Sequence, residues 1–103
     1  MSRIEKLLEL LKTAETDSFL QHALALEYIK TGDDERARVL FNSLLSREPG
    51  YVGSYYHLAK LLERAKEYDA AIDIYKKGLQ EAQKANDRHS YNELQMALEE
   101  IEE

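Results

Sequence analysis

The 103-residue chain contains no cysteine and no tryptophan, and it has only one proline and four glycines. Without cysteine, disulfides, thiolate catalysis and cysteine-ligated zinc sites are excluded. The scarcity of proline and glycine disfavours long loops and predicts a mostly helical protein. A chain of this length is expected to form one domain.

Positive charge is also in deficit, since the net charge is −6. This argues against non-specific nucleic-acid binding, which needs a basic surface, and against binding to an anionic membrane. No apolar run approaches the roughly 18 residues of a membrane span. The N-terminal stretch MSRIEKLLELLK places charges inside its apolar pattern, which is wrong for a secretory signal. We therefore expect a soluble cytoplasmic protein.

What the chain does contain is helical periodicity. Apolar spacing and stop signals predict helices over residues 2–14, 18–31, 34–47, 53–65, 69–84 and 88–101. Ser2 with Glu5, and Ser18 with Gln21, predict capping boxes at the first two. Gly32 stands where a helix-terminating glycine belongs. No strand pattern competes.

The chain also repeats itself when it is shifted by 34 residues. Large, small and aromatic residues each recur in register. The matching pairs are Leu10-Leu11 with Leu44-Leu45, Leu24-Ala25 with Leu58-Ala59, Ala37 with Ala71, and Phe41 with Tyr75. Small residues allow paired helices to approach closely, and large ones fill the space between them.

This pattern resembles the tetratricopeptide repeat family. The first complete repeat, residues 18–51, carries the signature at Gln21, Leu24-Ala25, Tyr28, Ala37, Phe41 and Pro49. The second, residues 52–85, carries it at Tyr55, Leu58-Ala59, Leu62, Ala71 and Tyr75. The second repeat departs from it at Gln83, where proline is expected, and at Lys66, where the first repeat has its turn glycine. The missing proline predicts a longer fifth helix.

The resemblance also implies how the whole chain is organised. Residues 1–17 would be an N-terminal helix, a degenerate half-repeat, and residues 86–103 a C-terminal capping helix. In this last helix Tyr91 and Leu94 match Tyr55 and Leu58 at a spacing of 36 rather than 34. The implied fold is an all-α solenoid of antiparallel helix pairs with a right-handed superhelical twist.

Possible chemistry is sparse. The acidic stretch TGDDERA, residues 31–37, is predicted to start a helix rather than hold a metal ion, because adjacent carboxylates lack the alternation of a calcium loop. His22, His57 and His89 lie too far apart in sequence for a zinc signature. No nucleophile elbow or phosphate loop occurs. We expect no enzyme activity, cofactor or metal, and a role as an enzyme subunit is the least favoured alternative.

In the resembling family, first helices line a concave groove that binds proteins. The matching positions here are Phe19, His22, Leu26, Ile29, Lys30, Tyr56, His57, Lys60 and Arg64. Against Glu63, the cations Lys30, Lys60 and Arg64 give this surface a charge of +3 − 1 = +2. This predicts a peptide or helix ligand, acidic or ending in a carboxylate. The alternatives are a homodimer formed through this surface, or end helices that cover it.

One family function can be tested by residue. Chaperone-tail receptors of this type hold an EEVD-type carboxylate with lysine, asparagine and arginine. The matching positions are His22, Leu26 and His57, followed by Asp87 and Tyr91 or by His89 and Glu93. None is a clamp residue, so we predict no carboxylate clamp.

Overall fold

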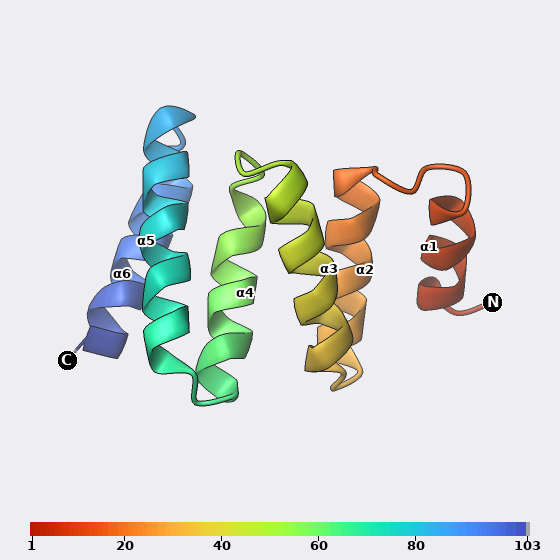
Figure 1. Cartoon of the computed structure of the whole chain (residues 1–103), viewed down its shortest axis with the longest axis horizontal. Coiled ribbons are helices and arrows are strands. Elements are labelled where there is room, and N and C mark those ends of the chain that lie inside the picture. Colours follow the sequence, from red (N-terminus) through yellow and green to blue (C-terminus); the bar gives the residue numbers. More distant parts are fainter. Residues whose placement is uncertain (103) are drawn as a thin grey trace. The chain divides into compact units, whose positions relative to one another are not determined.

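The computed structural model describes residues 1–102, which form six α-helices and no strand (Figure 1). The helices are α1 (Arg3–Leu11), α2 (Ser18–Lys30), α3 (Asp34–Arg47), α4 (Gly53–Arg64), α5 (Tyr68–Lys84) and α6 (Arg88–Glu102). The predicted all-α fold is confirmed. Helix α3 has the predicted bounds, whereas α1 ends at Leu11 rather than at residue 14. Within the described part of the chain, no helix has the length and apolar character needed to cross a membrane.

The chain forms two compact units, and the first comprises Met1–Glu48. Here α2 and α3 form an antiparallel pair, and α1 packs against α2 (Figure 1). Buried Leu7, Ala23 and Leu24 form the core between α1 and α2. Partly buried apolar side chains surround them, namely Ile4, Leu11, Leu20, Tyr28 and Leu40. Ala25 and Ala37 are fully buried, as expected of small residues where paired helices approach.

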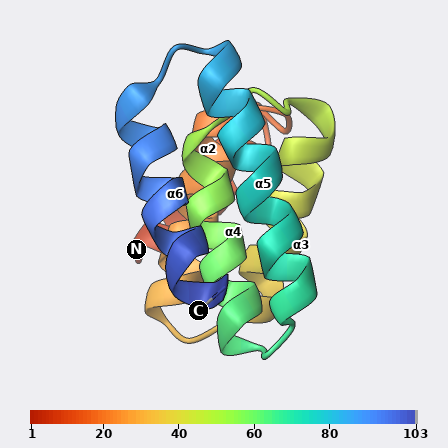
Figure 2. The same ribbon diagram turned by 90° about the vertical axis from the view of Figure 1, so that its left-hand side faces the viewer.

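The second unit begins at Pro49 and contains α4, α5 and α6. Helices α4 and α5 form the second antiparallel pair, and α6 packs along α5 and also contacts α4 (Figure 2). Tyr55, Leu58, Tyr75 and Leu94 are buried in its core. The helix α5 has 17 residues against 14 in α3, so the prediction of a longer fifth helix is confirmed.

At Gly78, helix α5 lies in tight contact with α4 and α6. A β-carbon placed on Gly78 would lie 2.7 Å from Cβ of Tyr55 on α4 and 3.0 Å from Cδ1 of Leu94 on α6. Cβ of Tyr55 cannot move without its backbone, so only glycine fits between α4 and α6 at this level. Gly78 is the 34-residue counterpart of Leu44, and the simple repeat pattern did not predict a glycine there.

The turns after α2, α4 and α5 share one geometry. Each contains a residue with positive φ: Gly32 at 82°, Lys66 at 62° and Asn86 at 56°. The following amide in each case donates to a carbonyl in the last turn of the helix: Asp33 N to Tyr28 O at 2.8 Å, Glu67 N to Leu62 O at 2.9 Å, and Asp87 N to Ala82 O at 2.9 Å. The predicted C-terminal role of Gly32 is confirmed, and Lys66 adopts the same turn without glycine's freedom.

Helix starts differ in their caps. The capping box of Ser2 and Glu5 is confirmed, but the one predicted for Ser18 and Gln21 is wrong. Asp17 is the N-cap of α2, because its carboxylate accepts the amide of Leu20 at 3.0 Å. The Asp33 carboxylate accepts the amide of Arg36 at 3.1 Å, so the interpretation of the acidic stretch as a helix start is confirmed.

Ser18 and Gln21 take part instead in a polar network between the start of α2 and the end of α3. A guanidinium nitrogen of Arg47 donates to Ser18 Oγ and to Gln21 Oε1, both at 2.9 Å. Ser18 donates in turn to the Glu48 carboxylate at 2.7 Å, and Gln21 donates to the carbonyl of Glu15 at 3.0 Å. Gln21 thus occupies a bulky signature position as a buried amide whose oxygen and nitrogen are both hydrogen-bonded.

Candidate interaction surfaces

The predicted groove residues of the second unit lie together on α4. Tyr56, Lys60 and Arg64 follow one another at four-residue intervals, so they share one side of the helix. The ammonium of Lys60 lies 5.6 Å from the centre of the Tyr56 ring, within the range of a cation–π contact. The His57 ring stands perpendicular to that of Tyr56, with centres 5.6 Å apart. These contacts hold the side chains in defined orientations before any partner binds.

Lys60 is tied to the core through a carboxylate. Its ammonium lies 3.5 Å from Glu63 Oε2, and the buried Tyr75 of α5 donates its hydroxyl to the same oxygen. Burial and this bond raise the pKa of Tyr75 well above its ordinary value. The hydroxyl is protonated at neutral pH, as in an ordinary tyrosine, and its bond holds the Glu63 carboxylate within reach of Lys60.

His57 faces α6 as well as Tyr56. Burial lowers the pKa of His57; the carboxylate of Glu93 on α6 acts in the opposite direction, and Arg64 lowers it further. Glu93 also lies 3.6 Å from the exposed His89. The helix α6 thus brings the Glu93 carboxylate close enough to the α4 surface to affect His57.

The groove residues predicted for the first unit lie on α2. Phe19 is 68% exposed, an unusual exposure for an aromatic side chain, while Leu26 and Ile29 are half-buried. The His22 ring packs edge-on against Phe41 of α3, with centres 5.8 Å apart. Lys30 lies 3.4 Å from Glu27, which also lies 3.5 Å from Arg3 of α1. The surface is therefore a mixture of aromatic, aliphatic and charged groups.

Charge on these two surfaces is more balanced than the sequence count implied. Lys30 and Lys60 each have a carboxylate partner, and the sequence count of four charges did not include Glu27 or Glu93. The attraction of these surfaces for an acidic ligand is correspondingly smaller. The absence of a carboxylate clamp stays a prediction.

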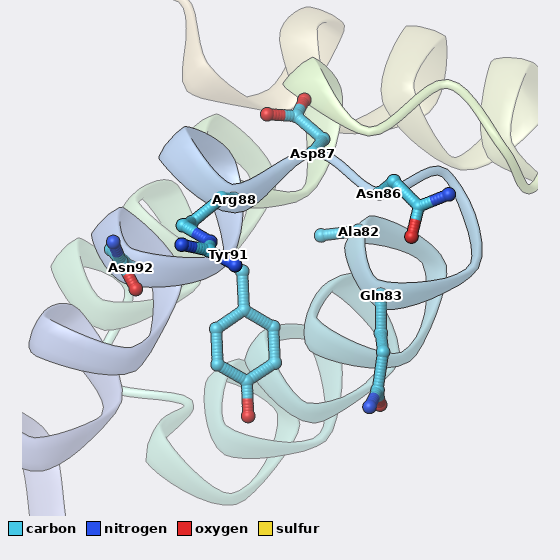
Figure 3. Close-up of a pocket in the computed structure, with 7 residues that line it drawn as sticks. All are labelled: Ala82, Gln83, Asn86, Asp87, Arg88, Tyr91 and Asn92. Carbon is cyan, nitrogen blue, oxygen red and sulfur yellow. The ribbon is translucent and has the colours of Figure 1, made fainter.

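A polar pocket at the turn between α5 and α6 was not predicted. It has a volume of about 460 Å³ and is lined by Ala82, Gln83, Asn86, Asp87, Arg88, Tyr91 and Asn92 (Figure 3). Figure 3 shows Gln83 and the Tyr91 ring pointing into the same space from the two helices. Two features of the sequence could have indicated this pocket, namely the missing proline at Gln83 and the shift of Tyr91 to a 36-residue spacing.

These groups can form hydrogen bonds and stacking contacts with a ligand. The carboxylate of Asp87 caps α6 by accepting the amide of Ser90 at 3.1 Å, and bonds from Ser90 lower its pKa. Over residues 1–102, no three His, Asp or Glu side chains gather closely enough to hold a metal ion.

Comparison with known proteins agrees with this geometry. The chain matches the family model for the tetratricopeptide repeat over residues 28–95. Two structures of a tetratricopeptide repeat domain protein from Salinibacter ruber, one in solution and one crystalline, are each 42% identical to it over 84% of this chain. The alignments cover 87% and 96% of those chains, with TM-scores of 0.80 and 0.81.

A solution structure of a protein from Bordetella parapertussis is 23% identical, with a TM-score of 0.84 over 98% of this chain and 88% of its own, and it shares the fold. A search of curated proteins returned no match. Because the family model covers most of both helix pairs and the Salinibacter structures align over most of the chain, the chain belongs to the tetratricopeptide repeat family.

Proposed function

We propose that this protein is an interaction module that binds a peptide or helix of another protein. The exposed faces of α2 and α4, the first helix of each repeat, would make the contacts. Domains of its family act in protein interaction, and a fold of this kind supplies surface rather than chemistry. The contact residues would be Phe19, His22, Leu26, Ile29 and Lys30 on α2, and Tyr56, His57, Lys60 and Arg64 on α4. The proposal includes no catalytic step, and it places the protein in the cytoplasm.

The observation that carries this proposal is the ordered set of side chains on α4. Tyr56 contacts both Lys60 and His57, and Lys60 pairs with Glu63, which also accepts the hydrogen bond of Tyr75. A surface whose aromatic and cationic groups are already oriented loses less side-chain entropy on binding. Aromatic residues of this kind often contribute most of the binding energy in protein interfaces.

The ligand we propose is acidic or ends in a free carboxylate, because Lys60 and Arg64 follow Tyr56 on the same side of α4. Glu63 moderates this preference, so electrostatic attraction would add selectivity more than affinity. An acidic side chain could share the Lys60 ammonium with Glu63 while its neighbouring apolar atoms pack on the Tyr56 ring.

The test is a pull-down from source lysate with the wild type and a variant carrying Tyr56→Ala and Lys60→Glu. A matched control carries Tyr68→Ala and Lys76→Glu, the same changes at exposed positions of α5. We expect partners lost by the α4 variant and retained by the control, with circular dichroism showing both to be folded. Equal recovery of every partner by the two variants would reject the α4 surface.

Self-association through the same surface is the second function to be tested. Small helical repeats often bury further area by pairing with a second copy. Sedimentation at several protein concentrations distinguishes self-association from binding to a different protein. A species that stays monomeric up to about 100 µM rules out a homodimer of micromolar affinity.

A further inference from the structure

The first unit contains an apolar groove that the proposed function does not use. It has a volume of about 350 Å³ and lies between α1 and α3, over α2. Leu24 and Tyr28 of α2 form its floor, Leu8 of α1 forms one wall, and Val39 and Leu40 of α3 form the other. The proposed peptide-binding residues of this unit lie elsewhere on α2, so the two surfaces are distinct.

The 34-residue register shows which of these residues the repeat itself needs. The two floor residues and one wall residue have apolar counterparts in the next repeat. Leu24 corresponds to Leu58, Tyr28 to Leu62 and Leu40 to Ile74. The two exposed wall residues do not recur, because Leu8 corresponds to Asn42 and Val39 to Asp73. Helix packing in the repeat is thus compatible with polar residues at both positions.

Leu8 and Val39 are nevertheless 43% and 66% exposed. Two exposed aliphatic side chains facing one groove are unfavourable in water, unless a partner covers them. The groove runs between two helices over a third, which is the arrangement that accepts the apolar side of an amphipathic helix.

Charge at the rim identifies the kind of helix. Two charged side chains border the groove, Glu35 and Arg36. The Arg36 guanidinium lies 2.9 Å from the Asp33 carboxylate and 5.8 Å from the centre of the Tyr28 ring, so its charge is neutralised locally. The Glu35 carboxylate makes no ion pair or side-chain hydrogen bond within residues 1–102, so it leaves the rim negative. The net charge of −6 would attract a basic ligand at longer range.

We infer that this groove binds a short amphipathic helix of another protein, one that places aliphatic side chains between Leu8 and Val39 and a lysine or arginine beside Glu35. The chain's own α6 is a poor occupant. Its exposed Met96 has Glu93, Glu99 and Glu100 as neighbours on the helix, and these would repel Glu35. The inference does not depend on the surface proposed above, since it concerns different residues and a ligand of opposite charge.

The experiment uses the full chain and two synthetic 14-residue helical peptides with the same leucine spacing, one flanked by lysine and one by glutamate. Isothermal titration gives the affinities, and amide chemical shifts of the labelled protein give the location. We expect the lysine peptide to bind more tightly, with the largest shifts in residues of α1 and α3.

Three variants and a control then test the residues. Leu8→Asn and Val39→Asp introduce the residues that the next repeat has in register, so the fold should tolerate them, and each should weaken binding about tenfold or more. Glu35→Gln should remove the preference for lysine, a change of about threefold to fivefold. Leu10→Asn is the matched control, because Leu10 is 53% exposed on the same helix but does not line the groove. It should bind normally.

Four results would overturn the inference. They are no binding of either peptide at millimolar concentration, equal losses for Leu8→Asn and Leu10→Asn, shifts centred on α4, and no preference for the lysine peptide. If the protein instead associates with itself and Val39→Asp abolishes that association, the occupant is a second copy, and a foreign helix is rejected.

Discussion

The hydroxyl of Tyr75 on α5 donates a hydrogen bond to the carboxylate of Glu63 on α4. In the 34-residue register, Tyr75 corresponds to Phe41 and Glu63 to Ile29. One repeat thus has an apolar pair where the other has a hydrogen-bonded polar pair. The polar residues occur together in the second repeat, as expected when a buried hydroxyl needs an acceptor. The polar pair also positions Lys60 on the proposed binding surface.

This relationship predicts a specific pattern of stability. Tyr75→Phe should lower the free energy of unfolding by about 1–2 kcal/mol, because a hydrogen bond to a charged acceptor is lost from a buried site. The double variant Tyr75→Phe with Glu63→Ile should lie within about 1 kcal/mol of the wild type, since it recreates the pair of the first repeat. Urea unfolding of the wild type, both single variants and the double variant measures the coupling. Purely additive effects would show that the bond contributes nothing.

The same tyrosine predicts an alkaline limit to stability. The folded state raises the pKa of Tyr75 above the unfolded value of about 10, through burial and the bond to Glu63. The folded protein therefore holds a proton that the unfolded chain releases, and the free energy of unfolding falls as pH rises above about 10. Tyr75→Phe should make this fall less steep. Identical slopes between pH 9 and 11 would contradict the assignment.

Much of the fold could be predicted because its signals are local. Helix bounds and the turn at Gly32 follow from residues that are close in sequence. The contact of Gly78 with Tyr55 and the bond between Tyr75 and Glu63 could not be predicted, because each depends on which atoms face one another across two helices. The cap at Asp17 was missed since Ser18 fits the same short pattern, and only geometry decides which oxygen reaches the amide.

In the candidate sites, too, some features could be predicted from the sequence and others could not. The residues of the α4 surface were predicted as a set from the resemblance to the tetratricopeptide repeat family, but their ion pairs were not. The polar pocket between α5 and α6 and the apolar groove beside α1 arise where the chain departs from its repeat, at Gln83, Leu8 and Val39. A search for similarity within the sequence emphasises what recurs, and so it passes over such positions.

At the three turns with a positive φ, we expect that introducing glycine and removing it change the stability in opposite directions. Lys66→Gly should stabilise the protein by up to about 1 kcal/mol, because a lysine at φ 62° has a strained backbone that glycine relieves. Gly32→Ala should destabilise it by about 1 kcal/mol, although its β-carbon would meet no atom within 4 Å. Asn86→Gly should change stability by less than about 0.5 kcal/mol, because asparagine tolerates this conformation. Thermal unfolding checks all three, and a loss of stability in Lys66→Gly would refute the strain.

We expect Gly78→Ala to lower the stability of the protein, although helix propensity alone predicts that it would raise it. Alanine in place of glycine within a helix normally stabilises by about 1 kcal/mol. Here the new methyl group would collide with Tyr55 and Leu94, and overpacking of this kind costs about 1–3 kcal/mol. We expect Gly78→Ala to be destabilising by about 1 kcal/mol overall. Gln80→Ala, at an exposed position of α5, is the control and should be nearly neutral. A stabilised Gly78→Ala protein would mean that α4 and α6 can separate at this level without cost.

His57 predicts how stability changes in mild acid. Burial holds its pKa below the ordinary value of about 6.5, while Glu93 opposes this shift and Arg64 adds to it. As pH falls below about 6.5, the unfolded chain takes up a proton that folded His57 does not, so the free energy of unfolding decreases until the folded pKa is passed. His57→Gln should reduce the loss of stability between pH 7 and pH 5. His89→Gln is the control, because the His89 side chain is 88% exposed and pairs with the same Glu93. If the two variants lose stability equally in acid, another group is responsible, and the α4 surface would keep one charge state across this range.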